Sequence, residues 1–590
     1  MASGNMVLIL GLHIGHNSSV CLMRDGEIVF AAQQERFDKI KNSGGFPKDA
    51  IDWILQTAGI SAQQLDAVAV SGETIVWFPL DLPPTGHEAG ISITPKALAT
   101  MLWRRIDYGH QNLRKLFFPL VMKNRVRNGL IGKEWLKKEI HSAYGIPFEK
   151  MFFIHHHICH AYAAYYGACK RSKKPLTLTV DGEGEEYCAG VNRIADGKLE
   201  RVASTPFFNS IGYVYSITTT YLGMKALEHE YKVMGLAPYA KEYFMKTYDN
   251  VFKDVIDVDT EKLVFTSPFP LTRFMYRLQE KAGGERFDNI AAALQYLTEQ
   301  VVGKWVKASA DKLGLDELYL GGGVFMNVKM NMKLAEMPEV KDINPFPSCG
   351  DESTPFGACY YVYLNHFWEK PREAKGIREL YLGPEYSNEY IEELIKKRDL
   401  KRKYGVEFHK DVEGEIAELL SKDMIVARLA GKSEWGARAL GNRSILGNPS
   451  RMETFYKVND QIKMRDFWMP FAPTVLAERG KDYVLNPKKL WAPYMIMAFH
   501  STELGQKELI AGIHQSDKTC RPQLLEKDWN PRYYKILKEF EKETGIGGVL
   551  NTSFNLHGEP MVCSPEDAIH TFEDSGLEHL AMENWVISKK

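Results

Sequence analysis

The sequence predicts an α/β protein with at least two folded parts. Short apolar runs typical of β-strands occur at residues 7–12, 177–181 and 317–321, and helical stretches lie between them. Strand-like runs return at residues 424–429 and 548–551. Strands that alternate with helices are typical of α/β folds. A chain of 590 residues is long enough for two or three such domains.

The first elements form a hairpin. The run at 7–12 is followed by a polar turn at 13–19 and by a second strand at 20–23. The sequence Arg24-Asp-Gly26 predicts a hairpin turn, after which residues 27–32 return as a third strand.

Two later stretches interrupt the strand and helix pattern. Residues 75–150 mix aromatic side chains with arginines such as Arg104 and Arg125. They are either a helical insertion with a solvated basic face or a cap that confers substrate specificity.

Residues 368–385 lack a clear period and contain two prolines. We therefore expect a first domain at 1–370, a linker at 371–385 and a second domain at 386–590.

Composition excludes several classes of protein. Lys and Arg number 74 and Asp and Glu 75, so the net charge of −1 excludes a globally basic nucleic-acid binder. A hydrophobic content of 45% excludes a disordered chain. The sequence has no apolar run long enough to span a membrane and no secretory signal. Eight cysteines without a C-x-x-C pair indicate a reduced, cytoplasmic protein.

Four histidines within six residues predict a metal site. His156 and His160 lie one helical turn apart, on one face of a helix, and His157 is a poorer second choice. Asp181 follows at the end of a predicted strand. The alternative is a polar helix start with incidental histidines. Imidazoles and carboxylates together favour a ferrous-type or similar divalent ion over a soft thiolate metal.

A glycine-rich turn predicts a nucleotide site. A strand runs into Gly321-Gly322-Gly323, where backbone N–H groups can approach a phosphate or ribose closely. The glycines alternatively serve only a tight strand-to-helix turn. Asp351 follows Gly350 at the start of a predicted helix and also suits a nucleotide or metal. Gly431-Lys432-Ser433 resembles the end of a P-loop, but Val426 stands where the motif requires glycine.

Basic residues gather around glycines near the C-terminus. Arg438 and Arg443 lie in one such segment, Lys463 and Arg465 follow, and residues 551–555 read Asn-Thr-Ser-Phe-Asn. Guanidinium groups bind phosphate with two parallel hydrogen bonds, and lysine adds a point charge. The alternative is a surface of arginines balanced by glutamates. The cluster predicts an anionic substrate.

Taken together and in order, these motifs resemble the O-carbamoyltransferases of nodulation-factor and antibiotic biosynthesis, over nearly the whole chain. The motifs that carry the resemblance are Gly15-His16-Asn17, Gln34-Glu35-Arg36-Phe37 with Lys41, His156-His157-x-x-His160, Asp181-Gly182, residues 230–238, Gly322-Gly323-x-x-x-Asn327, Gly350-Asp351, residues 436–444 and residues 551–555.

The resemblance implies two catalytic domains. The first is similar to tRNA threonylcarbamoyltransferases, with an actin-like (ASKHA) duplicated α/β fold, and the second is a YrdC-like α/β domain. The YrdC-like part would form carbamoyl-adenylate from carbamoyl phosphate and ATP with Mg²⁺. The actin-like part would transfer the carbamoyl group to a hydroxyl of a small-molecule natural product, such as an antibiotic or a saxitoxin-type toxin.

The resemblance also implies roles for individual residues. His16 would be the general base, and Lys41 would stabilise developing charge. The Fe²⁺-type ligands would be His156, His160, Asp181 and Asp351, and the nucleotide would lie on Gly322, Gly323 and Asn327. Carbamoyl phosphate and ATP would be held by Lys432, Arg438, Arg443, Lys463, Arg465, Arg521, Asn551, Ser553 and Asn555.

The chain departs from the family pattern at Asn17, Lys432 and Ala437, where Asp, Arg and Pro are common. Lys432 keeps the charge of an arginine but loses its two-pronged geometry.

Two further functions fit parts of the sequence. One is a carbamoyl- or threonylcarbamoyltransferase acting on tRNA, against which the near-neutral charge weighs. The other is an actin-like nucleotide-binding scaffold, which needs neither the arginines nor the histidine pair. Hydrogenase-maturation carbamoyltransferases are excluded because their C-x-x-C zinc motifs are absent. We expect no nucleic-acid or membrane partner, and symmetry base rates favour a homodimer.

Overall fold

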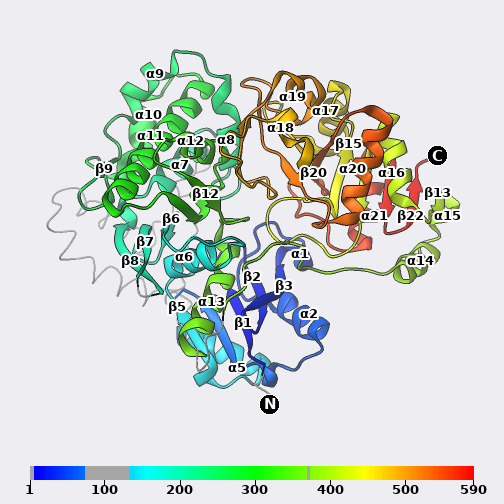
Figure 1. The fold of residues 1–590 in the computed structure, drawn as a ribbon, viewed down its shortest axis with the longest axis horizontal. Coiled ribbons are helices and arrows are strands. Elements are labelled where there is room, and N and C mark those ends of the chain that lie inside the picture. Colours follow the sequence, from blue (N-terminus) through cyan, green and yellow to red (C-terminus); the bar gives the residue numbers. More distant parts are fainter. Residues whose placement is uncertain (1–5, 73–132, 196, 368–372) are drawn as a thin grey trace, which may run out of the picture.

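The computed structural model describes residues 6–72, 133–195, 197–367 and 373–590. Within these ranges the chain forms two five-stranded sheets, a mixed sheet of eight strands and two short strand pairs. Figure 1 shows the first sheet at the bottom, the second at the upper left and the C-terminal part on the right. The predicted α/β fold class is confirmed.

The first sheet has the strand order β3-β2-β1-β4-β5. β1 (Leu8–His13), β2 (Ser19–Arg24) and β3 (Glu27–Gln33) form the predicted antiparallel hairpins. β4 (Ala67–Ser71) runs parallel to β1, and β5 (Met151–Ile154) runs parallel to β4. All six residues of β1 are buried, as expected for a central apolar strand with both faces covered.

The second sheet repeats this arrangement with the order β8-β7-β6-β11-β12. β6 (Pro175–Gly184), β7 (Tyr187–Ala195) and β8 (Lys198–Pro206) are antiparallel neighbours. β11 (Glu317–Gly321) runs parallel to β6, and β12 (Asp342–Pro345) runs parallel to β11. The same order and directions in both sheets give the duplicated architecture that the resemblance implies.

Each of two helices packs on the sheet that it does not follow in the chain. α6 (His156–Tyr166) follows β5 but packs on β6 and β11, whereas α13 (Thr354–His366) follows β12 but packs on β1 and β4. The helices also pack on each other, so closely that a Cβ at Gly357 would lie 1.7 Å from the carbonyl oxygen of Cys159. Side chains at the N-terminal ends of both helices therefore meet between the two sheets.

Further elements of the N-terminal part surround these sheets. They are α1 (Glu35–Asp38), α2 (Lys48–Ala58), α5 (Lys133–Tyr144), α7 (Ile211–Tyr221), α8 (Glu230–Leu236), α9 (Phe244–Thr247), β9 (Asp257–Asp259), β10 (Val264–Thr266), α10 (Phe274–Lys281), α11 (Phe287–Leu313) and α12 (Val328–Glu336). Of the predicted insertion at 75–150, residues 75–132 lie outside the described residues. Leu136 and Ile140 of α5 are buried in the core of the first sheet, so this end of the stretch belongs to the scaffold.

The C-terminal sheet has the order β13-β22-β21-β14-β15-β20-β16-β19. Its strands are β13 (Gly405–Phe408), β14 (Val426–Leu429), β15 (Arg443–Gly447), β16 (Ala472–Leu476), β19 (Gln523–Leu525), β20 (Gly548–Ser553), β21 (His579–Met582) and β22 (Trp585–Ser588). β14 pairs in parallel with β21, and β16 with β19, whereas the remaining pairs are antiparallel. This is a second α/β part, as predicted.

The helices of this part are α14 (Asn388–Lys397), α15 (Leu400–Lys403), α16 (Val412–Ser421), α17 (Met452–Val458), α18 (Gly480–Tyr483), α19 (Glu503–Glu508), α20 (Pro531–Thr544) and α21 (Pro565–Glu573). A short pair, β17 (Phe499–His500) and β18 (Thr519–Cys520), lies outside the main sheet. Residues 373–387 include most of the predicted linker. They form no helix and no strand of the sheets. Ile377, Leu380 and Leu382 are nevertheless buried, so this connection is part of the folded structure.

Candidate active site

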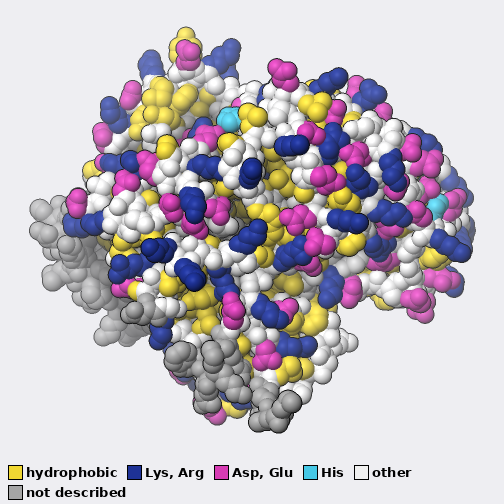
Figure 2. Space-filling view, in the orientation of Figure 1, with side chains coloured by type: hydrophobic (Ala, Val, Ile, Leu, Met, Phe, Trp, Pro, Cys, Tyr) yellow, Lys and Arg dark blue, Asp and Glu magenta, His cyan; other side chains and the backbone are white. Residues whose placement is uncertain are grey.

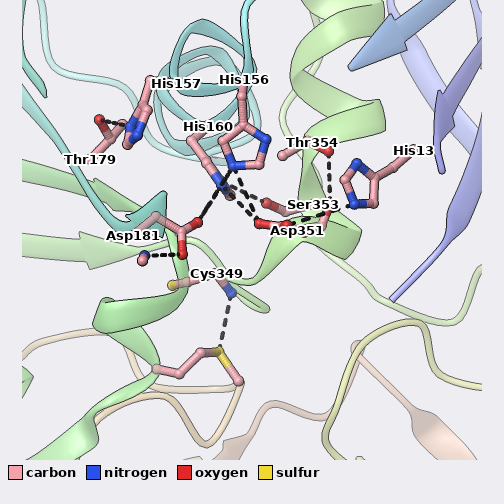
Figure 3. Close-up of polar contacts among 12 residues, drawn as sticks. His13, His156, His157, His160, Thr179, Asp181, Cys349, Asp351, Ser353 and Thr354 are labelled. Carbon is pink, nitrogen blue, oxygen red and sulfur yellow. Dashed lines mark hydrogen bonds and ion pairs between the residues drawn. The ribbon is translucent and has the colours of Figure 1, made fainter. Parts of the chain in front are cut away.

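Four predicted ligands converge where α6 and the turn before α13 begin. The Nε2 atoms of His156 and His160 lie 3.0 Å apart. Nε2 of His160 lies 3.0 Å from Oδ2 of Asp181, at the end of β6, and 3.4 Å from Oδ1 of Asp351. Oδ1 of Asp351 also lies 3.3 Å from Nε2 of His156 (Figure 3). One ligand atom from each residue lies within 4.8 Å of every other, as a single ion would require.

The hydrogen bonds of this cluster leave its facing atoms available as ligands. Nδ1 of His160 lies 3.3 Å from the hydroxyl of Ser353, so a proton on Nδ1 leaves Nε2 with its lone pair. Oδ1 of Asp181 accepts the N–H of Gly182 at 2.7 Å, which leaves Oδ2 toward the histidines. Two imidazole nitrogens and two carboxylate oxygens suit a divalent ion of the iron, zinc or manganese type.

The charges of the cluster also fit a cation. Burial opposes charge on His156, but the carboxylates of Asp351 and Asp181 outweigh it and raise the pKa of this imidazole well above its ordinary value. Burial likewise opposes charge on Asp351, yet His156 and His16 hold the pKa of this carboxyl well below its ordinary value. Two ionised carboxylates therefore face the place that a metal ion would take.

The other two histidines of the run have different roles. Nδ1 of His157 pairs with the hydroxyl of Thr179 at 3.0 Å, and Nε2 lies 3.0 Å from the carbonyl oxygen of Tyr187. His157 is thus a fully bonded core histidine. Nδ1 of His155 accepts the N–H of His157 at 3.2 Å and caps α6, which leaves the ring proton on Nε2.

That proton argues against a second metal at His155. Its Nε2 lies 3.1 Å from Oε2 of Glu185 and 3.5 Å from Oε2 of Glu186, an arrangement with the ligand types of a metal site. A nitrogen that carries the only ring proton can donate to these carboxylates but has no lone pair for a metal. We therefore assign no metal to this group.

The second oxygen of Asp351 extends the cluster toward His16. Oδ2 lies 3.7 Å from Nε2 of His13 and 3.5 Å from Nδ1 of His16. Burial lowers the pKa of His13 to about 4 despite the nearby Asp351, so this ring is neutral at pH 7. The side chain of His16 is 42% exposed. Sequence reasoning missed His13, and its only signal was a second histidine three positions before His16 at a strand end.

A cavity of about 820 Å³ joins this cluster to the C-terminal part. His16, Lys41 and Asp351 line it from the N-terminal side, together with His156 and Asp181. Of the residues predicted to hold nucleotide or phosphate, those that line the same cavity are Gly323, Asn327, Arg438, Lys463, Arg465, Arg521, Ser553 and Asn555. Residues far apart in the chain thus surround one space.

Among the described residues, no carboxylate forms an ion pair with the predicted phosphate ligands of this cavity, Arg438, Lys463, Arg465 and Arg521. Burial, Arg438 and Arg465 together hold the pKa of Arg521 well below its ordinary value. Burial and the neighbouring cations Arg465 and Lys41 lower the pKa of Lys463 in the same direction. The ammonium of Lys463 bonds to the carbonyl oxygens of Ser553 and Asn555 and to both of their side chains. Crowded cations of this kind suit the binding of an anion.

Four of the residues predicted to hold nucleotide or phosphate are not among those that line the cavity. The guanidinium of Arg443 is fully buried and donates to five backbone carbonyls, those of Pro384, Ala430, Gly431, Asn442 and Cys563, so it supports the loop and is not presented to the cavity. The Lys432 ammonium lies over the ring of Phe30. Asn551 donates to Ala439 and Thr474, and Gly322 packs against the carbonyl of Val180 at a φ of 97°.

Asn327 lines the cavity but is also a structural cap. Its Oδ1 accepts the N–H of Met330 at the start of α12, and its amide pairs with Gln295. The side chain of Asn327 is therefore fixed in the wall of the cavity.

The chain is similar to proteins of one family over most of its length. The chain matches the family models described as Carbamoyltransferase N-terminus, over residues 8–360, and Carbamoyltransferase C-terminus, over residues 417–589. An uncharacterized protein of Methanocaldococcus jannaschii, MJ1051, is 31% identical over 99% of this chain and 100% of its own. Nodulation protein NolNO of Sinorhizobium fredii is 28% identical over 98% of this chain and 79% of its own. The 3'-hydroxymethylcephem-O-carbamoyltransferase of Amycolatopsis lactamdurans is 24% identical, with 98% and 99% covered.

Proposed function

This chain belongs to the carbamoyltransferase family, and from that premise we propose that it is an ATP-dependent O-carbamoyltransferase that acts on a hydroxyl group of a small molecule. Family membership makes it a transferase. The observation that carries the finer proposal is the single cavity with a four-residue metal cluster on one side and uncompensated cations on the other.

The cations suit the first half of the reaction. In the proposed reaction carbamoyl phosphate, ATP and one water give carbamoyl-adenylate, pyrophosphate and phosphate. Water releases phosphate from carbamoyl phosphate, and an oxygen of the resulting carbamate attacks the α-phosphorus of Mg²⁺-bound ATP. Arg438, Arg465 and Arg521 would hold the phosphate groups, and Lys463 would fix Ser553 and Asn555 beside them.

The histidine cluster suits the second half. The acceptor oxygen attacks the carbamoyl carbon, the bond to the adenylate oxygen breaks, and AMP leaves. His16 would take the proton of the attacking hydroxyl, because its ring lies at the cavity surface and Asp351 orients it through Nδ1. Lys41 would oppose negative charge on the reacting group. An ion held by His156, His160, Asp181 and Asp351, Fe²⁺ by resemblance, would supply Lewis acidity.

The relatives favour a small acceptor. One named relative acts on a hydroxymethyl cephem and another is a nodulation protein. A polar natural product with a free hydroxyl is therefore the acceptor class we propose. Figure 2 shows acidic and basic side chains mixed over the visible face, unlike the basic surface expected of a tRNA-binding enzyme. A nucleotide-binding scaffold would have no need of uncompensated arginines.

A test of the first half-reaction needs no acceptor. The protein is incubated with ATP, Mg²⁺ and carbamoyl phosphate, and pyrophosphate, phosphate and AMP are followed. Carbamoyl-phosphate-dependent pyrophosphate supports the proposal, and Arg438→Met should abolish it. Arg479→Met is the matched control, because Arg479 lies outside the cavity and pairs with Asp482 and Glu541. No pyrophosphate from a folded, metal-loaded protein would refute the proposal.

A further inference from the structure

The turn that carries Arg438 is held in place from the other half of the chain. Within this turn, Oε1 of Glu434 accepts the N–H groups of Leu440, Asn442 and Arg443 at 2.7–3.2 Å and makes the segment one unit. The Nε of Arg438 itself is buried and has no hydrogen-bond partner among the described residues. The position of this guanidinium therefore depends on the backbone on which it stands.

Arg36 of α1 reaches that backbone from the N-terminal part. Its Nη2 donates to the carbonyl of Gly436 at 2.9 Å, two residues before Arg438. Its Nη1 donates to the carbonyl of Met561 at 3.3 Å, at the end of the segment 556–561 that lines the cavity. One guanidinium thus joins two C-terminal loops that form walls of the same cavity.

A second contact fixes the same turn. The N–H of Ala437 donates to the hydroxyl of Ser348 at 3.4 Å, and this hydroxyl donates to Glu352, the residue after the predicted ligand Asp351. Gly436 makes this approach possible, because its φ is 98° and a Cβ would lie 3.0 Å from Cβ of Ser348.

Arg36 also lines the cavity, but its guanidinium is engaged by these loops and by its own neighbours. Its charge is balanced by Oε1 of Glu35 at 3.1 Å, and Nη2 also donates to Gln33 at 3.1 Å. The residue is only 5% exposed. This distinguishes it from Arg438, Arg465 and Arg521, which no carboxylate neutralises by an ion pair among the described residues.

We infer that Arg36 is a positioning residue for the anion site of the C-terminal part, so that the N-terminal part completes the site at which carbamoyl phosphate and ATP react. This inference rests on the proposed function. It predicts that a substitution in the first 40 residues impairs a reaction assigned to the C-terminal part.

The test measures carbamoyl-phosphate-dependent ATP–pyrophosphate exchange in the full chain. Arg36→Met should raise KM for carbamoyl phosphate or ATP and lower kcat/KM roughly 10- to 100-fold, as expected when bonds from a charged donor are lost. Arg36→Lys keeps the charge, reaches at most one of the two carbonyls well, and should recover part of the loss.

Lys488 offers a matched control. Its ammonium also crosses between the two parts and donates to two backbone carbonyls, those of Met337 and Val340, but it does not line the cavity. Lys488→Met should leave the KM values within about twofold. If Arg36→Met shows the same KM and kcat/KM for ATP–pyrophosphate exchange as Lys488→Met, the inference is overturned. If Arg36→Met does not fold, an unchanged KM in Arg36→Lys overturns it.

Failure of the proposed function would be seen separately. If the wild-type protein itself shows no exchange, binding of inorganic phosphate is measured by calorimetry in the same proteins. A roughly tenfold weaker phosphate affinity in Arg36→Lys or Arg36→Met, with Lys488→Met unchanged, supports the positioning role without any turnover. Equal affinity in all of them refutes it.

Discussion

Arg465 is one of the cations that no carboxylate pairs with within the described ranges. We therefore expect it to lower the free energy of unfolding of the protein when no ligand is bound. The enclosed position of Arg465 is the largest influence on its guanidinium and lowers its pKa by about two and a half units from the ordinary arginine value, to about 10, although Tyr231 and Asp466 act in the opposite direction. Each pKa unit corresponds to 1.36 kcal/mol, so the charged form is disfavoured by about 3 kcal/mol. The side chain is partly exposed to the cavity, which makes this figure an upper bound.

Arg465→Met should therefore stabilise the ligand-free protein. The variant removes the disfavoured charge but also the contact of the guanidinium with Phe471, 4.4 Å from the ring centroid and worth about 1 kcal/mol. The net gain of up to about 2 kcal/mol corresponds to an increase in Tm of roughly 4–8 °C for a unit the size of the C-terminal part. Replacing buried charges by apolar side chains has this sign in other proteins.

The same variant should lose its response to phosphate. Inorganic phosphate at about 100 times its Kd stabilises the wild-type protein by about 2.7 kcal/mol, and this gain should be largely absent in Arg465→Met. Thermal unfolding with and without phosphate measures both effects. Arg479→Met should instead lower Tm, because Arg479 is paired with Asp482 and Glu541. A destabilised Arg465→Met that keeps the wild-type phosphate response would refute the reasoning.

Three further predictions concern the rest of the cavity. His16→Asn should abolish transfer to an acceptor but leave pyrophosphate formation within about twofold, as measured by the two half-reactions separately, and equal loss of both would contradict the assignment. His160→Ala should lose the bound divalent metal in elemental analysis, whereas His157→Gln should retain it, because His157 bonds only to Thr179 and Tyr187 among the described residues. Carbamoyl phosphate binding should weaken as pH rises, because the depressed pKa of Lys463 makes it lose its charge earlier than a free lysine. In Lys463→Arg the KM should rise less steeply with pH than in the wild-type protein, since arginine keeps its charge to higher pH than lysine; a KM that rises equally in both proteins would count against this role.

The sequence predicted the fold well because its signals were local. The apolar run of β1, the Asp-Gly turn and the strand before the three glycines each depend on neighbouring residues alone, and each stands where it was expected. The duplication was not visible in the residues themselves. The two sheets share a strand order but no repeated motif, so only the family resemblance implied it.

The metal cluster shows which ligands the local sequence pattern identifies and which it does not. Helical spacing selected His156 and His160, and the strand end indicated Asp181. Asp351 was a separate candidate for a nucleotide or metal, and only the resemblance joined it to the histidines, because it lies far along the chain. Spacing preferred His156 to His157, and the structure adds that the two differ in the groups that β6 and β7 place beside them. His157 meets Thr179 and a backbone carbonyl, and its hydrogen-bonding capacity is used there.

Arg438 and Arg443 show the same limit of the sequence pattern at the anion site. Five residues apart in one motif, they looked equivalent. Arg443 begins β15, and its buried side chain donates to five backbone carbonyls. Arg438 stands in the turn before the strand, and its Nε has no partner in the described part of the chain. A motif places a guanidinium near a site, but the surrounding acceptors decide whether it is free to bind.

The neutrality of the chain hides two strong local charges of opposite sign. The net charge is −1, yet one side of the cavity presents two ionised carboxylates and the other presents three arginines and a lysine. Each group is enclosed, so salt screens it less than surface charge, and each selects its own ligand. Carboxylates and imidazoles select a cation, whereas the guanidinium groups select phosphates. The contacts of Arg36 and Ser348 across the boundary fix the second group relative to the first, so substrate recognition by the C-terminal part depends on residues of the N-terminal part.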